Sequence, residues 1–286
     1  MKQSAHEFYA ENIESALEQQ ASTGNLDVPM LPEVASKVVR LTQHPDSDAA
    51  ELAQLIQSDQ PLAAHVMRVA NSAAYSPNAS LVSLQQAITR LGMRVIAEIA
   101  LSASINSKLF NTPGYEKYIA HILRSSFAAG LWAKEVARQC RKNVEAAFLA
   151  ALLKDIGRPV VVQTALACAN KNGTVLDNRA ILKLEAKFSH AFGLKVLNSW
   201  EMPNTVKDVL RYYGDYQHME PKPVQTIIVV AGCAISDYFC RTSTGDKRED
   251  LLTHPAFAAI NLYRDEVETI LLKENHIRSA LEAMSG

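Results

Sequence analysis

Lys154 and Asp155 stand next to each other in the run LLKDIG, among mostly apolar residues. A carboxylate can hold a divalent metal, act as a base or pair with a cation, whereas a lysine ammonium is only a donor and has no lone pair for a metal. Metal chemistry on a phosphate needs carboxylates or neutral imidazoles that converge from several helices. Most of the histidines, among them His6, His44 and His65, are scattered along the chain without ligand spacing.

The sequence lacks other catalytic motifs and argues against several classes of function. It contains no G-x-S-x-G, P-loop, G-x-G-x-x-G or H-E-x-x-H pattern. The net charge is −1 without a cluster of basic residues, so no nucleic-acid partner is expected. No apolar stretch approaches the ~20 residues that cross a bilayer, so no membrane partner is expected. The polar, acidic N-terminus is unlike a secretory signal, and four scattered cysteines without a C-x-x-C pair predict reduced thiols in the cytoplasm.

The positioning elements are helices, because the hydrophobic period is close to 3.6 nearly everywhere and strand signals are absent. The fold class is therefore predicted to be all-α. Residues 111–114 (NTPG) are the expected boundary between two helical lobes, and residues 241–250 (RTSTGDKRED) are expected to form a polar loop. In the second half and at the two ends, helices are predicted at 4–20, 159–170, 178–188, 190–200, 204–213, 223–241 and 264–283.

Several motifs in this order resemble the HDOD domain family, whose members are related to the HD-type metal-dependent phosphohydrolases. They are ANSAAY, AITRLG, LLKDIG and W-x-x-P, and the similarity runs from about Val28 to about Cys240. The resemblance implies a two-lobed helical HD-like fold and a place in bacterial signal transduction. The expected organisation is an N-terminal helical extension (1–27), an N-terminal lobe (28–112), an HD-like lobe (113–243), and a polar loop with a C-terminal helical extension (244–286).

The same resemblance implies where a metal would be held, and most of those positions have lost their ligands. Ser125 stands where the first histidine is expected, Lys154 replaces the histidine of the His-Asp pair, and Gly232 lies near the distal aspartate position. Tyr212 and Tyr213 replace a pair that is often histidine, so that only Asp155 and His190 are retained. A catalytic metal commonly needs three or more protein ligands. The HD site is thus predicted to be degenerate, with no cofactor or metal, and its remnant is a tentative binding pocket made of Ser125, Lys154, Asp155, His190, Tyr212 and Tyr213.

Two interpretations of the Lys154–Asp155 pair remain open at this point. Lys154, with Arg158 as a second cation, could replace a metal electrostatically by balancing Asp155. Alternatively, Lys154 points to solvent and Asp155 caps the helix that begins near Pro159. His190 is either part of a polar site or a satisfied histidine buried in the core, with the core favoured.

The predicted function is a non-catalytic signalling module that binds a partner protein or a nucleotide-like small ligand. The first alternative is a metal-dependent phosphohydrolase with a rearranged divalent-metal site of Asp155, His190 and His121; the second is a pure scaffold. A polar pocket beside these residues would favour binding, and apolar filling would favour a scaffold. The terminal helices are expected either to close the lobes or to form a homodimer.

Overall fold

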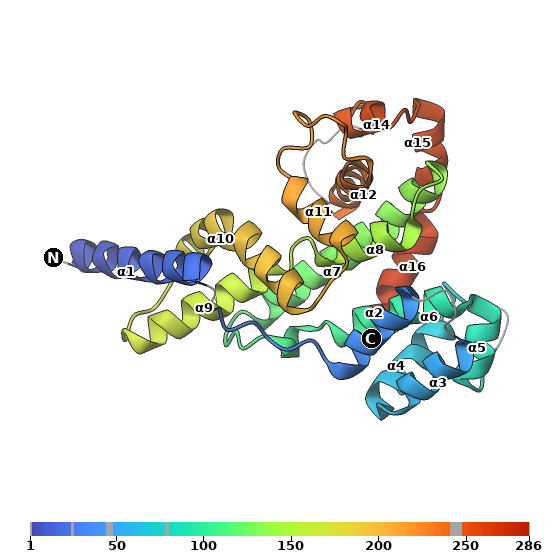
Figure 1. The fold of residues 1–286 in the computed structure, drawn as a ribbon, viewed down its shortest axis with the longest axis horizontal. Helices are drawn as coiled ribbons and strands as arrows, with labels where there is room; N and C mark the ends of the chain where they lie inside the picture. Colours follow the sequence, from blue (N-terminus) through green and yellow to red (C-terminus); the bar gives the residue numbers. More distant parts are fainter. Residues whose placement is uncertain (1, 24–25, 44–47, 78–79, 241–247, 286) are drawn as a thin grey trace.

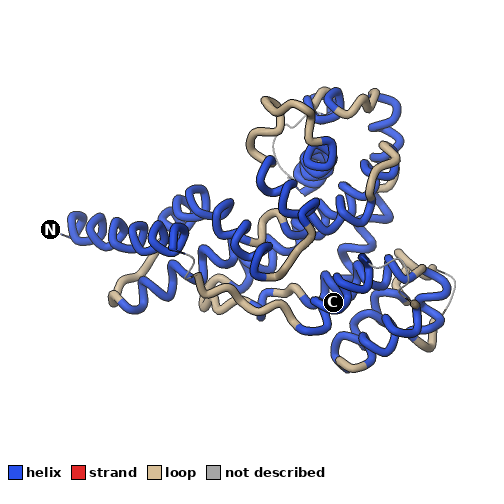
Figure 2. The backbone as a smooth tube through the Cα atoms, in the orientation of Figure 1, coloured by secondary structure: helices blue, strands red, loops and turns tan. Residues whose placement is uncertain are grey.

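The chain folds into helices joined by loops (Figures 1 and 2). The structure, a computed structural model, describes residues 2–23, 26–43, 48–77, 80–240 and 248–285, and these ranges contain no strand. The all-α prediction is confirmed. Within the same ranges no helix has both the length and the apolar character that a bilayer crossing requires.

The N-terminal lobe is built around a central helix, α6. Its helices are α2 (Glu33–Gln43), α3 (Ala49–Gln57), α4 (Gln60–Ala70), α5 (Leu84–Leu91) and α6 (Met93–Ser104). Helix α6 contacts each of the other four, and buried apolar side chains such as Val38, Leu52 and Val66 fill the space between them. Gly92 ends α5 and precedes α6 with a φ of 88°, a conformation that glycine adopts without steric cost.

The HD-like lobe follows a short 3-10 turn, η1 (Ser107–Leu109). Its helices are α7 (Glu116–Gln139), α8 (Val144–Leu153), α9 (Gly157–Lys171), α10 (Asn178–Ser199), α11 (Asn204–Tyr212) and α12 (Val224–Cys240). Helix α7 packs against α8 and α12, and α9 packs against α10. The prediction of separate helices at 178–188 and 190–200 is wrong, because Ser189 continues α10 without a break and hydrogen-bonds its side chain to the Glu185 carbonyl.

Two glycines allow the helices of this lobe to approach one another closely. A Cβ on Gly157 would lie 2.6 Å from Gly193 N and closer still to the Ser189 carbonyl oxygen. A Cβ on Gly232 would lie 2.5 Å from the Cα of Ala133. Only glycine fits at such crossings, so α9 is locked against α10 and α12 against α7.

The N-terminal extension packs on the HD-like lobe. Helix α1 (Lys2–Thr23) contacts α9 and α10, with Ile13 and Leu17 fully buried and Lys187 of α10 paired with Glu14 and Glu18. In Figure 1 its beginning extends beyond the other helices. This extension therefore adds to one lobe and does not bridge the two.

The C-terminal extension does bridge the lobes. It comprises α13 (Arg248–Leu252), α14 (Pro255–Ala259), α15 (Arg264–Leu271) and α16 (Glu274–Ser285). The predicted single helix 264–283 is wrong, because the chain turns between α15 and α16 so that α15 packs on α7 and α13, whereas α16 packs on α7 and α4. An Arg68 guanidinium nitrogen on α4 donates to the Ala283 carbonyl at 2.8 Å. Residues 241–247 of the predicted polar loop lie outside the described residues, and the remainder, from Arg248, is helical.

Candidate functional site

Lys154 and Asp155 form an ion pair at the junction between α8 and α9. Lys154 is the C-cap of α8, and its Nζ donates to Asp155 Oδ2 at 2.6 Å. Helix α9 begins at Gly157 with Ile156 as its N-cap and without a side-chain hydrogen bond to its first turn. Of the two interpretations of this pair, the ion pair is therefore correct and the cap by Asp155 is wrong.

Tyr213 and Cys233 lie on the other side of the Lys154 ammonium. Its Nζ is 5.2 Å from the centre of the Tyr213 ring, and the Tyr213 side chain interacts with the buried Cys233. Burial raises the pKa of Tyr213, and it raises the pKa of Cys233 to about 11. Both groups are therefore neutral at pH 7, and they face a charged lysine.

The Lys154 ammonium is held in its charged form by these surroundings. Burial alone would lower its pKa, but Cys233, Asp155 and Asp237 together outweigh burial and raise the pKa of Lys154. A protonated lysine has three donors and no acceptor, so it cannot contribute to a metal. The position where the family resemblance implies a histidine ligand therefore carries a positive charge.

Cys233 is a site residue that sequence reasoning missed, although its position was traceable. The sequence comparison placed the distal aspartate near Gly232, but Gly232 faces the backbone of α7 at Ala133. The next residue, Cys233, faces the ion pair, and Asp237 lies one helical turn beyond Cys233 on α12. The i, i+4 spacing of Cys233 and Asp237 was the available signal.

A second polar cluster, of Tyr118, Arg158 and Glu185, lies beside this ion pair. Arg158 donates to the Tyr118 hydroxyl at 2.7 Å, and that hydroxyl donates to Glu185 Oε2 at 2.5 Å. Arg158 Nε is also 3.4 Å from the other oxygen of the buried Glu185, an ion-pair contact without hydrogen-bond geometry. Burial, followed by the hydrogen bond to Glu185, raises the pKa of Tyr118 to about 12. Arg158 thus pairs directly with Glu185. Burial alone would lower the pKa of Arg158, but Glu185, Tyr118 and Asp155 outweigh burial and raise it, so Arg158 also interacts electrostatically with Asp155, as expected.

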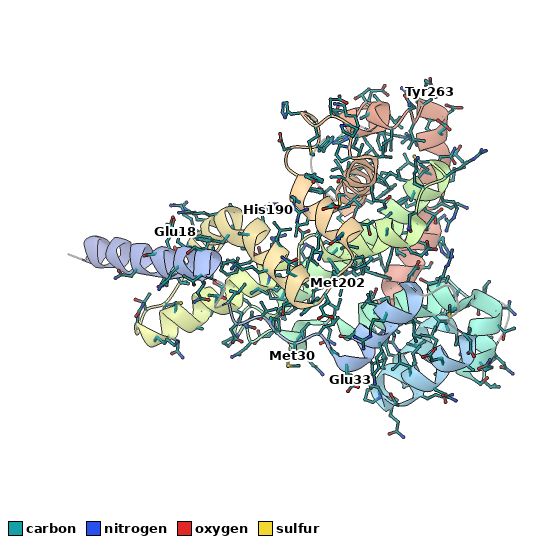
Figure 3. All side chains as sticks on the ribbon, viewed as in Figure 1. Glu18, Met30, Glu33, His190, Met202 and Tyr263 are labelled. Carbon is teal, nitrogen blue, oxygen red and sulfur yellow. The ribbon has the colours of Figure 1, made fainter. Side chains whose placement is uncertain are left out.

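The other predicted site residues each have surroundings of their own. His190 lies exposed on α10 (Figure 3), with its Nε2 3.0 Å from the Leu210 carbonyl oxygen, so the expectation of a buried core histidine is wrong. The guanidinium carbon of Arg211 lies 6.0 Å from the centre of the Tyr212 ring. Ser125 is half-buried on α7. His121 is exposed on α7 and lines a cavity between the lobes.

Lys154 and Asp155, whose place in the fold is called the HD position from here on, do not form part of a site that fits a divalent metal. Among the residues that the structure describes, no group of three or more His, Cys, Asp or Glu side chains is arranged to hold an ion. Asp155 has an ammonium as its nearest partner, and His190 is engaged with a backbone carbonyl. The set Asp155, His190 and His121 is not brought together as a metal centre.

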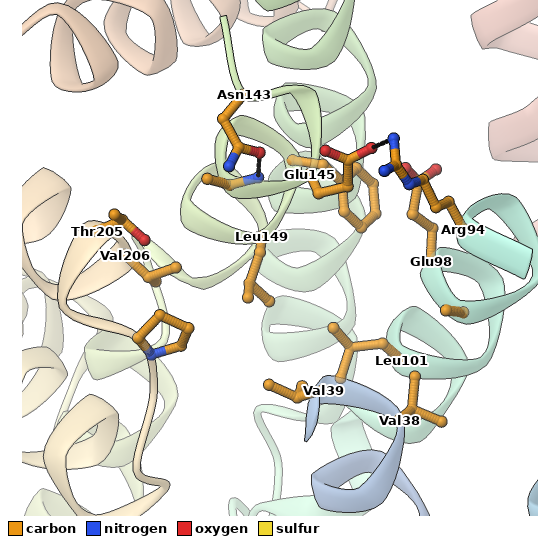
Figure 4. A pocket seen from close by; sticks show the side chains of 14 residues that line it. Val38, Val39, Arg94, Glu98, Leu101, Asn143, Glu145, Leu149, Thr205 and Val206 are labelled. Atoms are coloured by element: carbon orange, nitrogen blue, oxygen red, sulfur yellow. Dashed lines mark hydrogen bonds and ion pairs between the residues drawn. The ribbon is translucent and has the colours of Figure 1, made fainter. Parts of the chain in front are cut away.

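A first cavity of about 470 Å³ opens between the two lobes. Helices α2 and α6 form one side and α8 and α11 the other, and Figure 4 shows apolar side chains such as Val39, Leu101 and Leu149 lining it. At its rim Arg94 and Glu145 form an ion pair of 2.7 Å that connects α6 to α8. This cavity has both apolar and polar walls, and Arg94, the one cation that lines it among the described residues, is already paired with Glu145.

A second cavity of about 460 Å³ lies at another part of the lobe junction. Its wall includes His65 of α4, residues 102–106 at the end of α6, one face of α7, Leu152 of α8, and Leu281 and Met284 of α16. The face of α7 contributes Lys117, His121 and Arg124, and among the residues that the structure describes no carboxylate lines the cavity. The second cavity therefore combines apolar walls with uncompensated positive charge.

Sequence comparison assigns the family. Residues 28–216 match the HDOD domain, and the chain belongs to the HDOD domain family. A curated relative, an uncharacterised protein of Treponema pallidum, is 21% identical over 219 residues, which are 73% of this chain. The chain spans only 42% of the length of that relative.

Solved structures of low sequence identity share the fold. A protein of Shewanella amazonensis, provisionally described as a metal-dependent phosphohydrolase, has a TM-score of 0.73 at 22% identity, over 96% of this chain and 99% of its own. An HDOD domain protein of unknown function from Geobacter sulfurreducens has a TM-score of 0.70 at 21% identity, with 96% and 98% covered. A protein of Marinobacter aquaeolei, provisionally described as acting in signal transduction, has a TM-score of 0.67 at 22% identity, with 98% and 66% covered.

Proposed function

We propose that this HDOD protein is a non-catalytic signalling module of the cytoplasm whose HD position has become a structural ion pair. The observation that carries the proposal is the Lys154 ammonium, 2.6 Å from Asp155 and 5.2 Å from the ring of Tyr213. It supplies the positive charge that a cation would bring, and it supplies no open coordination position. Hydrolysis by a metal-activated water needs such a position.

The placement of the two histidines supports the same proposal. His190 has a hydrogen bond to the backbone of Leu210, and His121 belongs to the wall of the second cavity, which Asp155 does not line. A rearranged metal site would require these two side chains and Asp155 to converge within coordination distance. The donor set is therefore one carboxylate beside a lysine.

The two cavities at the lobe junction support binding of a small signal ligand over a pure scaffold. Each has the size of a typical ligand site, with apolar walls and a few polar groups. A ligand bound there would contact both lobes, and it would favour the relative lobe position that it fits best. The module would report the ligand through that change.

Metal content and hydrolysis of 1-naphthyl phosphate test this proposal in the full chain. We expect substoichiometric binding of Mn²⁺, Fe²⁺ and Zn²⁺, and release of naphthol no faster than with the Asp155→Ala variant. Lys154→His, which restores a His-Asp pair, is expected to remain inactive because further ligands do not converge there. A stoichiometric metal that disappears in Asp155→Ala, with hydrolysis lost in parallel, would establish a phosphohydrolase and contradict the proposal.

A further inference from the structure

In the described part of the chain, the second cavity has positively charged side chains without ion-pair partners, which the first cavity lacks. Lys117, His121 and Arg124 follow one another at i, i+4 and i+7, which places them on one face of α7. Among the described residues, neither Lys117 nor Arg124 takes part in an ion pair that would neutralise it. In the first cavity, by contrast, Arg94 already has Glu145 as its partner.

His65 adds a donor to the same wall. Its Nδ1 lies 2.8 Å from a nitrogen of Arg68, which can only donate, so Nδ1 is the acceptor and the hydrogen of the neutral ring is on Nε2. Burial and the charge of Arg68 lower the pKa of His65, which keeps the ring neutral at pH 7. Its Nε2–H is buried and has no hydrogen-bond partner among the described residues. A buried donor left without a partner costs free energy that a ligand oxygen could recover.

Apart from Ser102 and Asn106, the rest of the wall is apolar and comes from several parts of the chain. Phe127 of α7, Leu152 of α8 and Leu281 of α16 line it, so an occupant would touch the HD-like lobe and the C-terminal extension as well as His65 in the N-terminal lobe. Leu152 precedes the Lys154–Asp155 pair by two residues, at the end of the same helix. The cavity thus adjoins the elements whose relative positions define the lobe arrangement.

We propose that the second cavity binds a small organic anion, in which one carboxylate or phosphate group faces Lys117 and Arg124 and an apolar body lies against Phe127, Leu152 and Leu281. The inference extends the proposed function by naming the chemical class of its signal ligand. Charge-assisted hydrogen bonds from a lysine and an arginine supply the selectivity, and burial of the apolar body supplies affinity. The anion would hold α7 and α16 together across the junction.

Calorimetric titration with three naphthalene probes tests the proposal on the full chain. The probes are 1-naphthoate, 1-naphthyl phosphate and the uncharged 1-naphthalenemethanol, and we expect at least one anion to bind about tenfold or more tightly than the alcohol. Comparison of the two anions distinguishes a carboxylate ligand from a phosphate ester. Equal binding of all three probes, or no saturable binding of either anion, overturns the proposal.

Matched variants locate the binding. Lys117→Gln with Arg124→Gln is expected to remove the preference for the anion and leave alcohol binding unchanged. Lys171→Gln with Arg179→Gln removes one exposed lysine and one exposed arginine outside the cavity and is expected to change neither. Leu281→Trp, which fills the cavity, is expected to abolish binding of all three probes. Anion binding that survives the Lys117/Arg124 change overturns the assignment, whereas hydrolysis of the bound naphthyl phosphate would overturn only the non-catalytic function.

Discussion

The HD position and the lobe junction each contain a lysine paired with a carboxylate, but the two pairs have different tasks. Lys154 and Asp155 are neighbours in sequence, 2.6 Å apart, on helices that are packed through glycine contacts. Lys134 of α7 and Glu98 of α6 are 36 residues apart, and their 2.5 Å contact joins the two lobes. The first pair closes a local site, whereas the second fixes two larger bodies relative to each other.

The two pairs also differ in the packing around them. Close helix contacts at Gly157 and Gly232 lie near the Lys154–Asp155 pair. At the lobe junction the packing is looser, and two cavities of about 470 and 460 Å³ remain. The space for a ligand therefore lies between the lobes, and Glu98 of the buried Lys134–Glu98 pair lines the first cavity.

The largest expected effect comes from the packing beneath the HD position. Gly157→Ala places a Cβ 2.6 Å from Gly193 N and against the Ser189 carbonyl, and both obstacles are backbone atoms that cannot rotate away. We expect a loss of more than about 4 kcal/mol in the free energy of unfolding, or failure to fold, measured by urea denaturation followed by circular dichroism.

Gly214→Ala is the matched control for this substitution. No atom outside the neighbouring residues lies within 4 Å of a Cβ built at Gly214, and its φ is not in the left-handed region. Its effect should stay within about 0.5 kcal/mol. A Gly157→Ala protein as stable as Gly214→Ala would show that α9 and α10 are not closely packed at this crossing.

The second-largest expected effect concerns the Lys134–Glu98 pair at the lobe junction. Glu98→Ala leaves the Lys134 ammonium, which is 13% exposed, without its partner in a poorly hydrated place. Breaking a buried ion pair from one side typically costs about 3–5 kcal/mol, because a charge stays buried and uncompensated. The Glu98→Leu, Lys134→Met double variant should recover most of that loss. If the double variant were as unstable as Glu98→Ala, packing and not the unpaired charge would explain the result.

The Lys154–Asp155 pair should contribute less to the free energy of unfolding than the Lys134–Glu98 pair. Lys154→Met removes the hydrogen bond to Asp155, but that carboxylate is 25% exposed and can be hydrated in place. We expect a cost of about 1.5–3 kcal/mol in urea denaturation, the range for losing a hydrogen bond to a charged group. Gain of stoichiometric metal by Lys154→Met is not expected. A cost equal to that of Glu98→Ala would remove the distinction between the two regions.

The elements of the fold were largely predictable from the sequence, because their apolar period is local information. Where prediction failed, tertiary contacts decided the outcome: the turn before α16 allows contact with α4, and α10 continues through Ser189. The hydrophobic period of the sequence indicates neither the turn before α16 nor the continuity of α10.

The candidate site was predictable only in its centre. The Lys154–Asp155 pair was one of two open interpretations, because side chains that are adjacent in sequence need not touch, and the structure was needed to choose between them. Its partner Cys233 was missed because the neighbouring Gly232 turns toward Ala133, a detail that depends on how α12 is rotated against α7. The cluster of Tyr118, Arg158 and Glu185 joins three helices through side-chain geometry, which spacing along one chain does not encode.

The smallest expected effect is a difference in pH dependence between the two pairs. Burial raises the pKa of Glu98 above its ordinary 4.5, and Lys134 only partly offsets this. The folded state then keeps the Glu98 proton at pH values where the unfolded chain has lost it, so the contribution of Glu98 to the free energy of unfolding falls as the pH rises from 4.5 through the raised pKa. Glu98→Gln cannot titrate at this position.

The stability of the natural protein minus that of Glu98→Gln should therefore decrease as the pH rises above 4.5. The corresponding difference for Lys154→Met should stay flat up to neutral pH, since the pKa of Lys154 is raised above its ordinary 10.5 and its contribution is lost only at higher pH. Urea denaturation of the three proteins at a series of pH values measures both differences. A Glu98 difference that grows with pH would mean that Lys134 outweighs burial, and the junction pair would then be held as firmly in its charged form as the pair at the HD position.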